Sequence, residues 1–216
     1  MTMRFEVTDR LAERTAEELH DAIVGVLRTD ERCSLALSGG HGPAPAFRAL
    51  ARMPIDFARV DVFQVDERVA PRGHPDRNLT LIEDAFLSNI EGDPPRMYEM
   101  PVDGTPDPDR YAHELPAVLD VVHLGMGPDG HTASLVPGDP VLEVRDRRVA
   151  MSGPYQNYLR MTMTYPTLDA AAKIIFMIDG ETKRDALRKL EAGDTSIPAA
   201  RIAARDVLVL TDVSGG

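Results

Sequence analysis

The stretch "DVVHLGMGPDGHTASLVPG", residues 120–138, joins a largely apolar run to a turn rich in glycine. The apolar residues of "DVVHLGM" (120–126) are continuous and do not alternate with polar ones, as is typical of a strand covered on both faces. Such strands belong to sheets packed between helices, and ligands bind beyond their carboxyl ends. The stretch therefore predicts an α/β fold with the turn at a ligand-binding edge.

The rest of the chain repeats this pattern. Similar apolar runs occupy residues 33–37, 60–65, 173–179 and 206–212. Helical spacing of apolar residues predicts helices over 8–28, 43–53, 78–90, 107–115 and 180–192. We expect a single domain over residues 1–216, with a largely parallel sheet covered by helices on both faces. Alternation in "LRMTMT" (159–164) predicts a half-exposed strand that would suit an antiparallel position at the sheet edge, and its place in the strand order stays open.

Composition narrows the function class. The chain has 24 Lys and Arg against 35 Asp and Glu, a net charge of -11, which disfavours nucleic acid or an anionic membrane as partner. No apolar run approaches the roughly 20 residues of a membrane span, and no signal peptide is recognisable, so we expect a cytoplasmic protein. The only cysteine, Cys33, lies in an apolar run and is expected to be a core thiol.

Three glycines after the central strand, Gly125, Gly127 and Gly130, have the spacing G-x-G-x-x-G. A dinucleotide site would need a long helix next, but Pro137 interrupts it, and "RRVAMSGPY" (147–155) offers no carboxylate. The turn instead presents Asp129 and His131. A histidine beside a carboxylate can move a proton near neutral pH, although a histidine in a turn can also be purely structural.

Other predicted strand ends carry candidate binding residues. A glycine loop before a helix can direct backbone N–H groups at an anion, and side chains at strand ends face the same edge of the sheet. The alternatives are a structural turn, a surface ion pair and solvated cations. The candidates are Ser38, Gly39, Gly40, His41 and Gly42, then Asp66, Glu67 and Arg68, then Arg77 and Asn78, and finally Lys183.

Motifs of other enzyme classes are missing. The sequence has no G-x-S-x-G, no H-E-x-x-H and no paired C-x-x-C. Neither a serine hydrolase nor a zinc enzyme is supported, and we expect no metal site.

Taken in order, "LALSGGHGP" (35–43), "VFQVDERVAP" (62–71), "LGMGPDGHTASLVPG" (124–138), "LRMTMTYPTLDAAAKIIFMIDGETKRDAL" (159–187) and "IPAARI" (197–202) resemble the 6-phosphogluconolactonase family. The broader group includes glucosamine-6-phosphate deaminases. The resemblance implies a Rossmann-like three-layer sandwich and cofactor-free hydrolysis of 6-phospho-D-glucono-1,5-lactone to 6-phosphogluconate in the oxidative pentose phosphate pathway. It places phosphate at the first glycine loop and Lys183, and makes His131 the general base.

A mechanism follows as a hypothesis. His131 takes a proton from water, Asp129 positions His131, and Arg68 holds the substrate or its oxyanion, with no covalent nucleophile. Gly127, Gly130 and Arg160 are assigned to substrate binding along with the candidates above.

Two positions depart from the family. This chain has "SGGHGP" where "SGGSTP" is usual, so His41 is expected to supply a donor in place of hydroxyls, and Arg77 in "RNLTL" is expected to add a phosphate contact. The expected partner is a small phosphorylated sugar lactone, and the expected state is a monomer. The alternatives are a glucosamine-6-phosphate deaminase or isomerase and a non-catalytic sugar-phosphate sensor.

Overall fold

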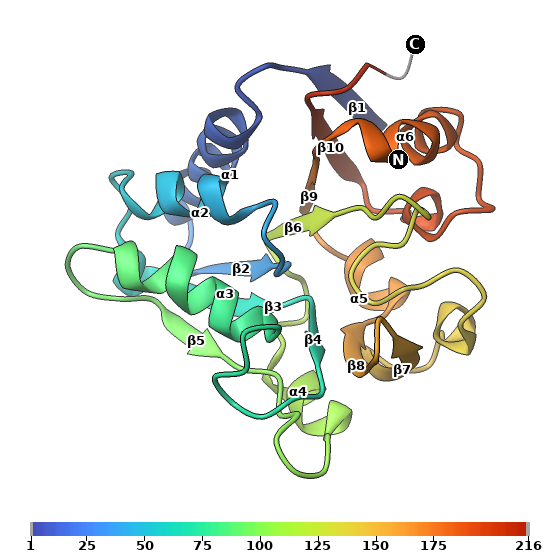
Figure 1. The fold of residues 1–216 in the computed structure, drawn as a ribbon. Helices are drawn as coiled ribbons and strands as arrows, with labels where there is room; N and C mark the ends of the chain where they lie inside the picture. Colours follow the sequence, from blue (N-terminus) through green and yellow to red (C-terminus); the bar gives the residue numbers. More distant parts are fainter. Residues whose placement is uncertain (1, 215–216) are drawn as a thin grey trace.

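A seven-stranded parallel sheet forms the centre of the computed structural model, which describes residues 2–214 (Figure 1). Its strand order is β1-β10-β9-β6-β2-β3-β5. The bounds are β1 (Thr2–Val7), β2 (Cys33–Leu37), β3 (Val60–Gln64), β5 (Arg96–Tyr98), β6 (Val121–Gly125), β9 (Lys173–Ile178) and β10 (Asp206–Thr211). All pairings between these strands are parallel, as the continuous apolar runs predict.

Helices cover both faces of the sheet and make three layers. One layer holds α1 (Leu11–Leu27), α2 (Ala44–Ala51) and α3 (Asn78–Ala85), and the other holds α4 (Pro108–Glu114), α5 (Tyr165–Asp169) and α6 (Arg184–Glu191). Short 3₁₀ turns occupy Phe57–Arg59, Leu87–Asn89, Pro140–Glu143, Glu181–Lys183 and Pro198–Arg201.

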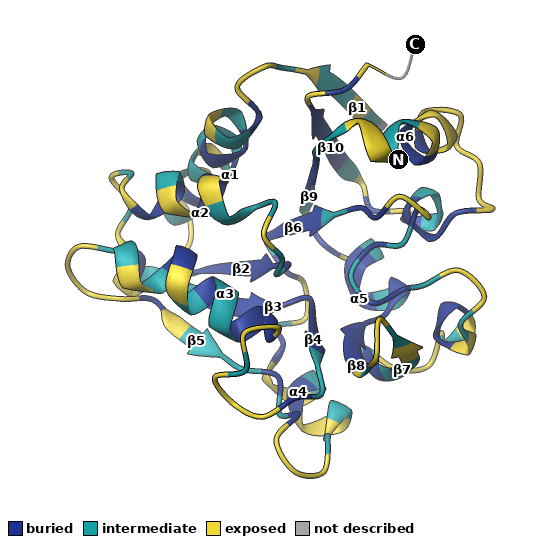
Figure 2. Cartoon of the chain, in the orientation of Figure 1, coloured by how far each residue is buried: buried dark blue, intermediate teal, exposed yellow. Residues whose placement is uncertain are grey.

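Two hydrophobic cores lie on opposite sides of the central sheet. In β2, Leu35 and Leu37 pack with the α1–α3 layer, whereas Ala36 between them packs into the other core. This alternation is the pleat of a strand buried on both faces. Figure 2 shows the central strands as buried and the outer surfaces of the helices as exposed. Cys33 is buried in the α1–α3 core, as expected for a core thiol.

A second, antiparallel sheet differs from the prediction. It has the order β4-β8-β7, with β4 (Asp66–Arg68), β7 (Val149–Tyr155) and β8 (Tyr158–Met163). The prediction that residues 159–164 lie at the edge of the main sheet is therefore wrong. These residues alternate because Met161 and Met163 enter a core while Thr162 faces buried polar groups: its hydroxyl accepts from the Ser134 N–H.

The predicted helices and central strands are confirmed to within a few residues. No sequence pattern predicted β1, β4, β5, β7 or α5. β1 is an edge strand in which Arg4 and Glu6 interrupt the apolar residues, so no apolar run is visible. Charged side chains on an edge strand also oppose pairing with another chain. Among the described residues, no helix is long and apolar enough to cross a membrane.

The order of the central sheet reverses at β6. From β2 the chain adds β3 and β5 on one side, and it then returns to add β6, β9 and β10 on the other. In open α/β sheets such a reversal leaves a crevice outside the carboxyl ends of the strands. The segments that follow β2, β3, β6 and β9 are thus brought together at one edge.

Candidate active site

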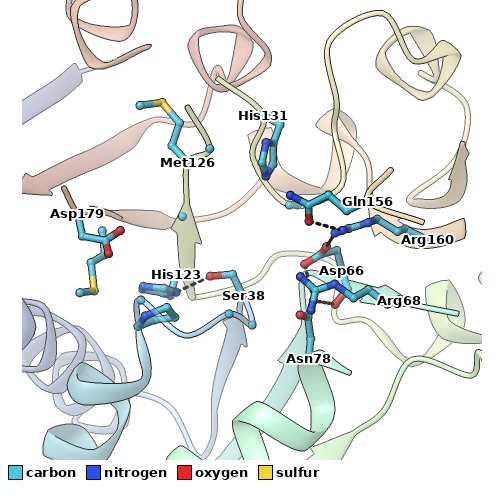
Figure 3. A pocket seen from close by; sticks show the side chains of 18 of the residues that line it. Ser38, Asp66, Arg68, Asn78, His123, Met126, His131, Gln156, Arg160 and Asp179 are labelled. Atoms are coloured by element: carbon cyan, nitrogen blue, oxygen red, sulfur yellow. Dashed lines mark hydrogen bonds and ion pairs between the residues drawn. The ribbon is translucent and has the colours of Figure 1, made fainter. Parts of the chain in front are cut away.

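A cleft of about 290 Å³ lies at this reversal point, which is room for a small ligand. Its lining comes from Ser38, Gly39, Gly40, Gly42, Pro43, Asp66, Arg68, Asn78, His123, Gly125, Met126, Gly127, His131, Ala133, Gln156, Arg160, Met177, Asp179 and Lys183. Figure 3 shows side chains on two sides of this cleft. We call the side with Asp66, Arg68, His131, Gln156 and Arg160 the base wall, and the side with Ser38, Gly39, Gly40, Gly42, His123, Asp179 and Lys183 the loop wall.

The turn after β6 presents His131 to the cleft. Its Nδ1 lies 2.5 Å from Asp129 Oδ1, and its backbone N–H donates to the same oxygen at 3.2 Å. Because a carboxylate only accepts, Nδ1 carries the proton in this pair and Nε2 is left as the basic nitrogen. Partial burial acts to raise the pKa of Asp129, but the hydrogen bonds and charge of His131, with a hydrogen bond from Tyr155, outweigh it and lower that pKa. Asp129 therefore stays ionised behind the histidine.

Two glycines make this turn possible. A Cβ on Gly127 would lie 2.1 Å from His131 Cε1, and one on Gly130 would lie 2.5 Å from Ile197 Cβ. Gly130 also has φ of +81°, which side chains other than glycine rarely adopt. Gly127 lines the cleft, whereas Gly130 packs against Ile197 outside it, so the expected ligand contact from Gly130 is not supported.

Asp66, from β4, is the buried acid of the base wall. It accepts hydrogen bonds from Ser134 Oγ at 2.6 Å and Asn78 Nδ2 at 3.0 Å, and its Oδ2 lies 3.7 Å from Arg160 Nη1. Burial raises the pKa of Asp66, opposed by the Ser134 hydrogen bond and the charge of Arg160. This network joins β4, α3 and β8 at the cleft.

Two arginines supply the positive charge of the base wall. Arg160 is buried, and its Nη2 donates to Gln156 Oε1 at 3.1 Å, while burial lowers the pKa of its guanidinium. Arg68 is half-buried and donates to the backbone carbonyl of Asp76. Guanidinium groups at the rim of a cleft can hold an anion or a developing oxyanion.

The glycine loop after β2 is held by close contacts. A Cβ on Gly39 would lie 2.2 Å from Asn78 Oδ1, so glycine is required for the loop to approach α3. Ser38 Oγ lies 2.8 Å from Nδ1 of His123, a buried residue in β6. Burial lowers the pKa of His123 to about 3, so this imidazole is neutral.

Lys183 faces the loop wall but already has a partner there. Its Nζ forms an ion pair with Asp179 Oδ1, and both residues line the cleft. A Cβ on Gly42 would lie 3.1 Å from Asp179 Oδ2, so the carboxylate packs against the loop at this glycine. The loop wall thus combines one cation with one fixed carboxylate.

Three residues that were predicted to contact the substrate do not line the cleft. Glu67 and Arg77 are fully buried outside the cleft, where Arg77 Nε lies 3.0 Å from Glu67 Oε2. The expectation that they contact substrate is wrong, because the pair serves the start of α3: Glu67 accepts from the Asn78 and Leu79 N–H groups. His41 is exposed and lines an adjoining hollow with Asp76 and not the cleft, so it does not stand in for the missing hydroxyls.

Sequence reasoning missed four residues at the site. His123 was hidden inside an apolar run, although a histidine next to a glycine turn is a visible signal. Asp179 ends a predicted strand and could have been noticed as a carboxylate at the ligand edge. Tyr155 and Gln156 come from the unpredicted hairpin β7–β8, and nothing in the sequence indicated them.

The assembled groups suit general-base hydrolysis. A histidine paired with a carboxylate, two guanidinium groups and a glycine loop meet at one cleft. Within residues 2–214, no cluster of three or more histidine, cysteine, aspartate or glutamate side chains is arranged to hold a metal.

Structural comparison finds the same fold in several enzymes. A 6-phosphogluconolactonase from Thermotoga maritima has a TM-score of 0.88 at 22% identity, covering 97% of this chain and 99% of that one. A monomeric glucosamine-6-phosphate deaminase has a TM-score of 0.83 at 22% identity, covering 98% and 97%. The fold alone therefore does not separate the two activities.

Sequence comparison is more specific. A 6-phosphogluconolactonase from Nostoc sp. is 34% identical over 208 residues, 88% of this chain and 86% of the relative. One from Streptomyces coelicolor is 32% identical over 219 residues, 90% and 84%. The family model described as glucosamine-6-phosphate isomerases/6-phosphogluconolactonase matches residues 6–210. The matched residues include the segments that build the cleft. This chain therefore belongs to that family.

Proposed function

We propose that this protein hydrolyses 6-phospho-D-glucono-1,5-lactone to 6-phosphogluconate, the lactonase reaction of the oxidative pentose phosphate pathway. The observation that carries the proposal is the His131–Asp129 pair in a cleft whose far side holds a glycine loop and Lys183. The relatives named as 6-phosphogluconolactonases support the choice of lactone over amino sugar.

In the proposed mechanism, Nε2 of His131 takes a proton from a water molecule as that water attacks the lactone carbonyl. Asp129 keeps the imidazole in the required tautomer and stabilises the imidazolium. Arg68, with Arg160 beside it, holds the substrate or the oxyanion of the tetrahedral intermediate. When this intermediate collapses, the bond from the carbonyl carbon to the ring oxygen breaks, and the ring oxygen leaves as a hydroxyl group by taking the proton from the imidazolium of His131. A δ-lactone is an activated ester, so neither a covalent nucleophile nor a cofactor is required.

Substrate binding is assigned to the loop wall. The backbone N–H groups of residues 38–42 and the ammonium of Lys183 bind the phosphate, and Asn78 supports the loop. We propose that the protein acts as a cytoplasmic monomer on this small molecule and has no nucleic-acid partner.

The test is a coupled assay in which glucose-6-phosphate dehydrogenase makes the lactone and its disappearance is followed above the spontaneous rate. We expect His131→Ala to lower kcat by about 10²- to 10⁴-fold, the usual range for a general base. A His131→Ala variant that keeps the wild-type kcat would contradict the assignment of His131 as the general base. Ammonia release from glucosamine 6-phosphate would support the deaminase, and tight 6-phosphogluconate binding without turnover would support a sensor.

A further inference from the structure

Tyr155, at the end of β7, contacts His131 and Arg160 of the base wall as well as Asp129, yet it has no place in the mechanism above. We infer that Tyr155 is a positioning residue: its hydroxyl group fixes Asp129 so that the carboxylate meets Nδ1 of His131. This inference rests on the proposed function only for its kinetic readout.

The two oxygens of Asp129 are used separately. Oδ1 faces His131 Nδ1 at 2.5 Å, and Oδ2 accepts from the Tyr155 hydroxyl at 3.1 Å. Because a carboxylate is planar, fixing the second oxygen also fixes the direction of the first. The Tyr155 ring meets the His131 ring edge-on, with centroids 5.1 Å apart and planes at 62°. The tyrosine therefore restrains both members of the pair.

The hairpin holds Tyr155 in turn. Gln156 and Asn157 connect β7 to β8 with φ values of 50° and 71°. Arg160 in β8 places its guanidinium 5.2 Å from the centre of the Tyr155 ring, and its Nε donates to the Tyr155 carbonyl at 3.3 Å. Arg160 also lines the cleft beside Asp66, so Tyr155 links the arginine side of the base wall to the histidine.

The hydroxyl is suited to remain a donor. Burial, followed by the charge of Asp129, raises the pKa of Tyr155 above its ordinary value of 10.0, so the phenol stays protonated at neutral pH. A donor on Oδ2 draws negative charge from the carboxylate and limits how strongly Asp129 holds the imidazole proton. Tyr155 thereby adjusts the basicity of the pair as well as its geometry.

The experiment compares Tyr155→Phe with Tyr158→Phe. Tyr158 is the matched control, since it lies in the same hairpin and its hydroxyl donates to Asp76 Oδ2 at 2.7 Å and not to Asp129. We expect Tyr155→Phe to lower kcat about tenfold, with KM changed less than about twofold, as for one hydrogen bond to a charged group. The acid limb of kcat/KM and the NMR titration of the His131 imidazole should both move to higher pH, because Asp129 and Tyr155 are the ionisable groups in contact with the ring.

Each outcome bears on a different claim. Unchanged kcat and an unchanged imidazole titration in Tyr155→Phe would overturn the inference. The titration needs no substrate, so a shift in a protein that hydrolyses no lactone would leave the positioning role intact and refute the proposed function. A second variant, Asp129→Asn, removes the acceptor, and adding Tyr155→Phe to it should have little further effect on kcat. Full additivity would show that Tyr155 does not act through Asp129.

Discussion

The carboxylate of Asp179 is an unusual neighbour for the proposed phosphate site. It pairs with Lys183 and packs against Gly42, so it lies where a phosphorylated ligand would seek the same cation. A side chain at position 42 would press on this carboxylate, so the glycine at position 42 leaves room for it. The residue therefore weakens the attraction of the loop wall for an anion.

Replacing this carboxylate should improve phosphate binding. We expect Asp179→Asn to lower KM for the phosphorylated lactone about fivefold, roughly the 1 kcal/mol of a partly exposed charge interaction. The unphosphorylated lactone, measured in parallel, should show no change. Glu181→Gln is the matched control, since Glu181 pairs with Arg184 outside the cleft. A raised KM in Asp179→Asn would mean that the carboxylate binds substrate itself.

Single residues of the site could be predicted where a histidine or a charged residue comes soon after a predicted strand. His131, Asp129 and Arg68 follow short apolar runs, and the structure brings them to one edge of the fold. Glu67 follows the same pattern, and Arg77 directly precedes a predicted helix, but both side chains are buried in the protein. Sequence position gives the strand end but not which side chain turns inward, because that depends on the neighbouring helix start that Glu67 caps.

At the scale of elements, the buried pair Glu67–Arg77 joins β4 to the start of α3. Glu67 also accepts from Gln64 Nε2 at 2.7 Å, and Arg77 Nη1 donates to the Ala70 carbonyl at 3.1 Å. A carboxylate at a helix N-terminus is favourable, and here it replaces the usual capping side chain. The pair thus sets the positions of Asp66, Arg68 and Asn78 without touching a ligand.

Breaking this pair should destabilise the protein strongly. Arg77→Met leaves a buried carboxylate without its cation, and we expect the free energy of unfolding to fall by about 3–5 kcal/mol. Urea denaturation followed by circular dichroism measures it. Arg4→Met, which removes an exposed ion pair with Asp206, should cost less than about 1 kcal/mol. Equal losses in the two variants would be inconsistent with a structural role for the buried pair.

Strands could be predicted from the sequence where they are buried on both faces. The five central strands carry continuous apolar runs, whereas the strands of the small sheet draw on polar contacts such as Ser134 with Thr162. The hairpin that carries Tyr155 depends on partners from β4, far away in sequence, and such pairing leaves no local signal.

At the scale of the whole molecule, His123 couples stability to pH. It is buried in β6 between the layers, with a pKa of about 3 against an ordinary value of 6.5. Because the folded state holds it neutral, its contribution to stability is complete above pH 6.5 and is lost as the pH falls towards 3. Neutral His123 is also packed edge-on against Phe47, with centroids 5.0 Å apart.

His123→Leu should therefore flatten the acid side of the stability curve. Between pH 6 and pH 4, wild type should lose about 1.4 kcal/mol per pH unit more than the variant, the value for one proton. Urea unfolding at several pH values gives the difference, and other titrating groups cancel in the comparison. Parallel curves for the two proteins would show that His123 is not neutral when folded.

The two walls of the cleft come from different parts of the chain, and this separation bears on how the protein can diversify. The groups proposed to move the proton lie on a framework of β4, the hairpin and the turn after β6, whereas the groups proposed to bind the phosphate lie on the loop after β2 and just past the end of β9. Substitutions such as the one at Gly42 can accumulate on one wall while the other is kept. A lineage with this architecture can thus exchange its substrate by mutation and retain its hydrolytic chemistry throughout.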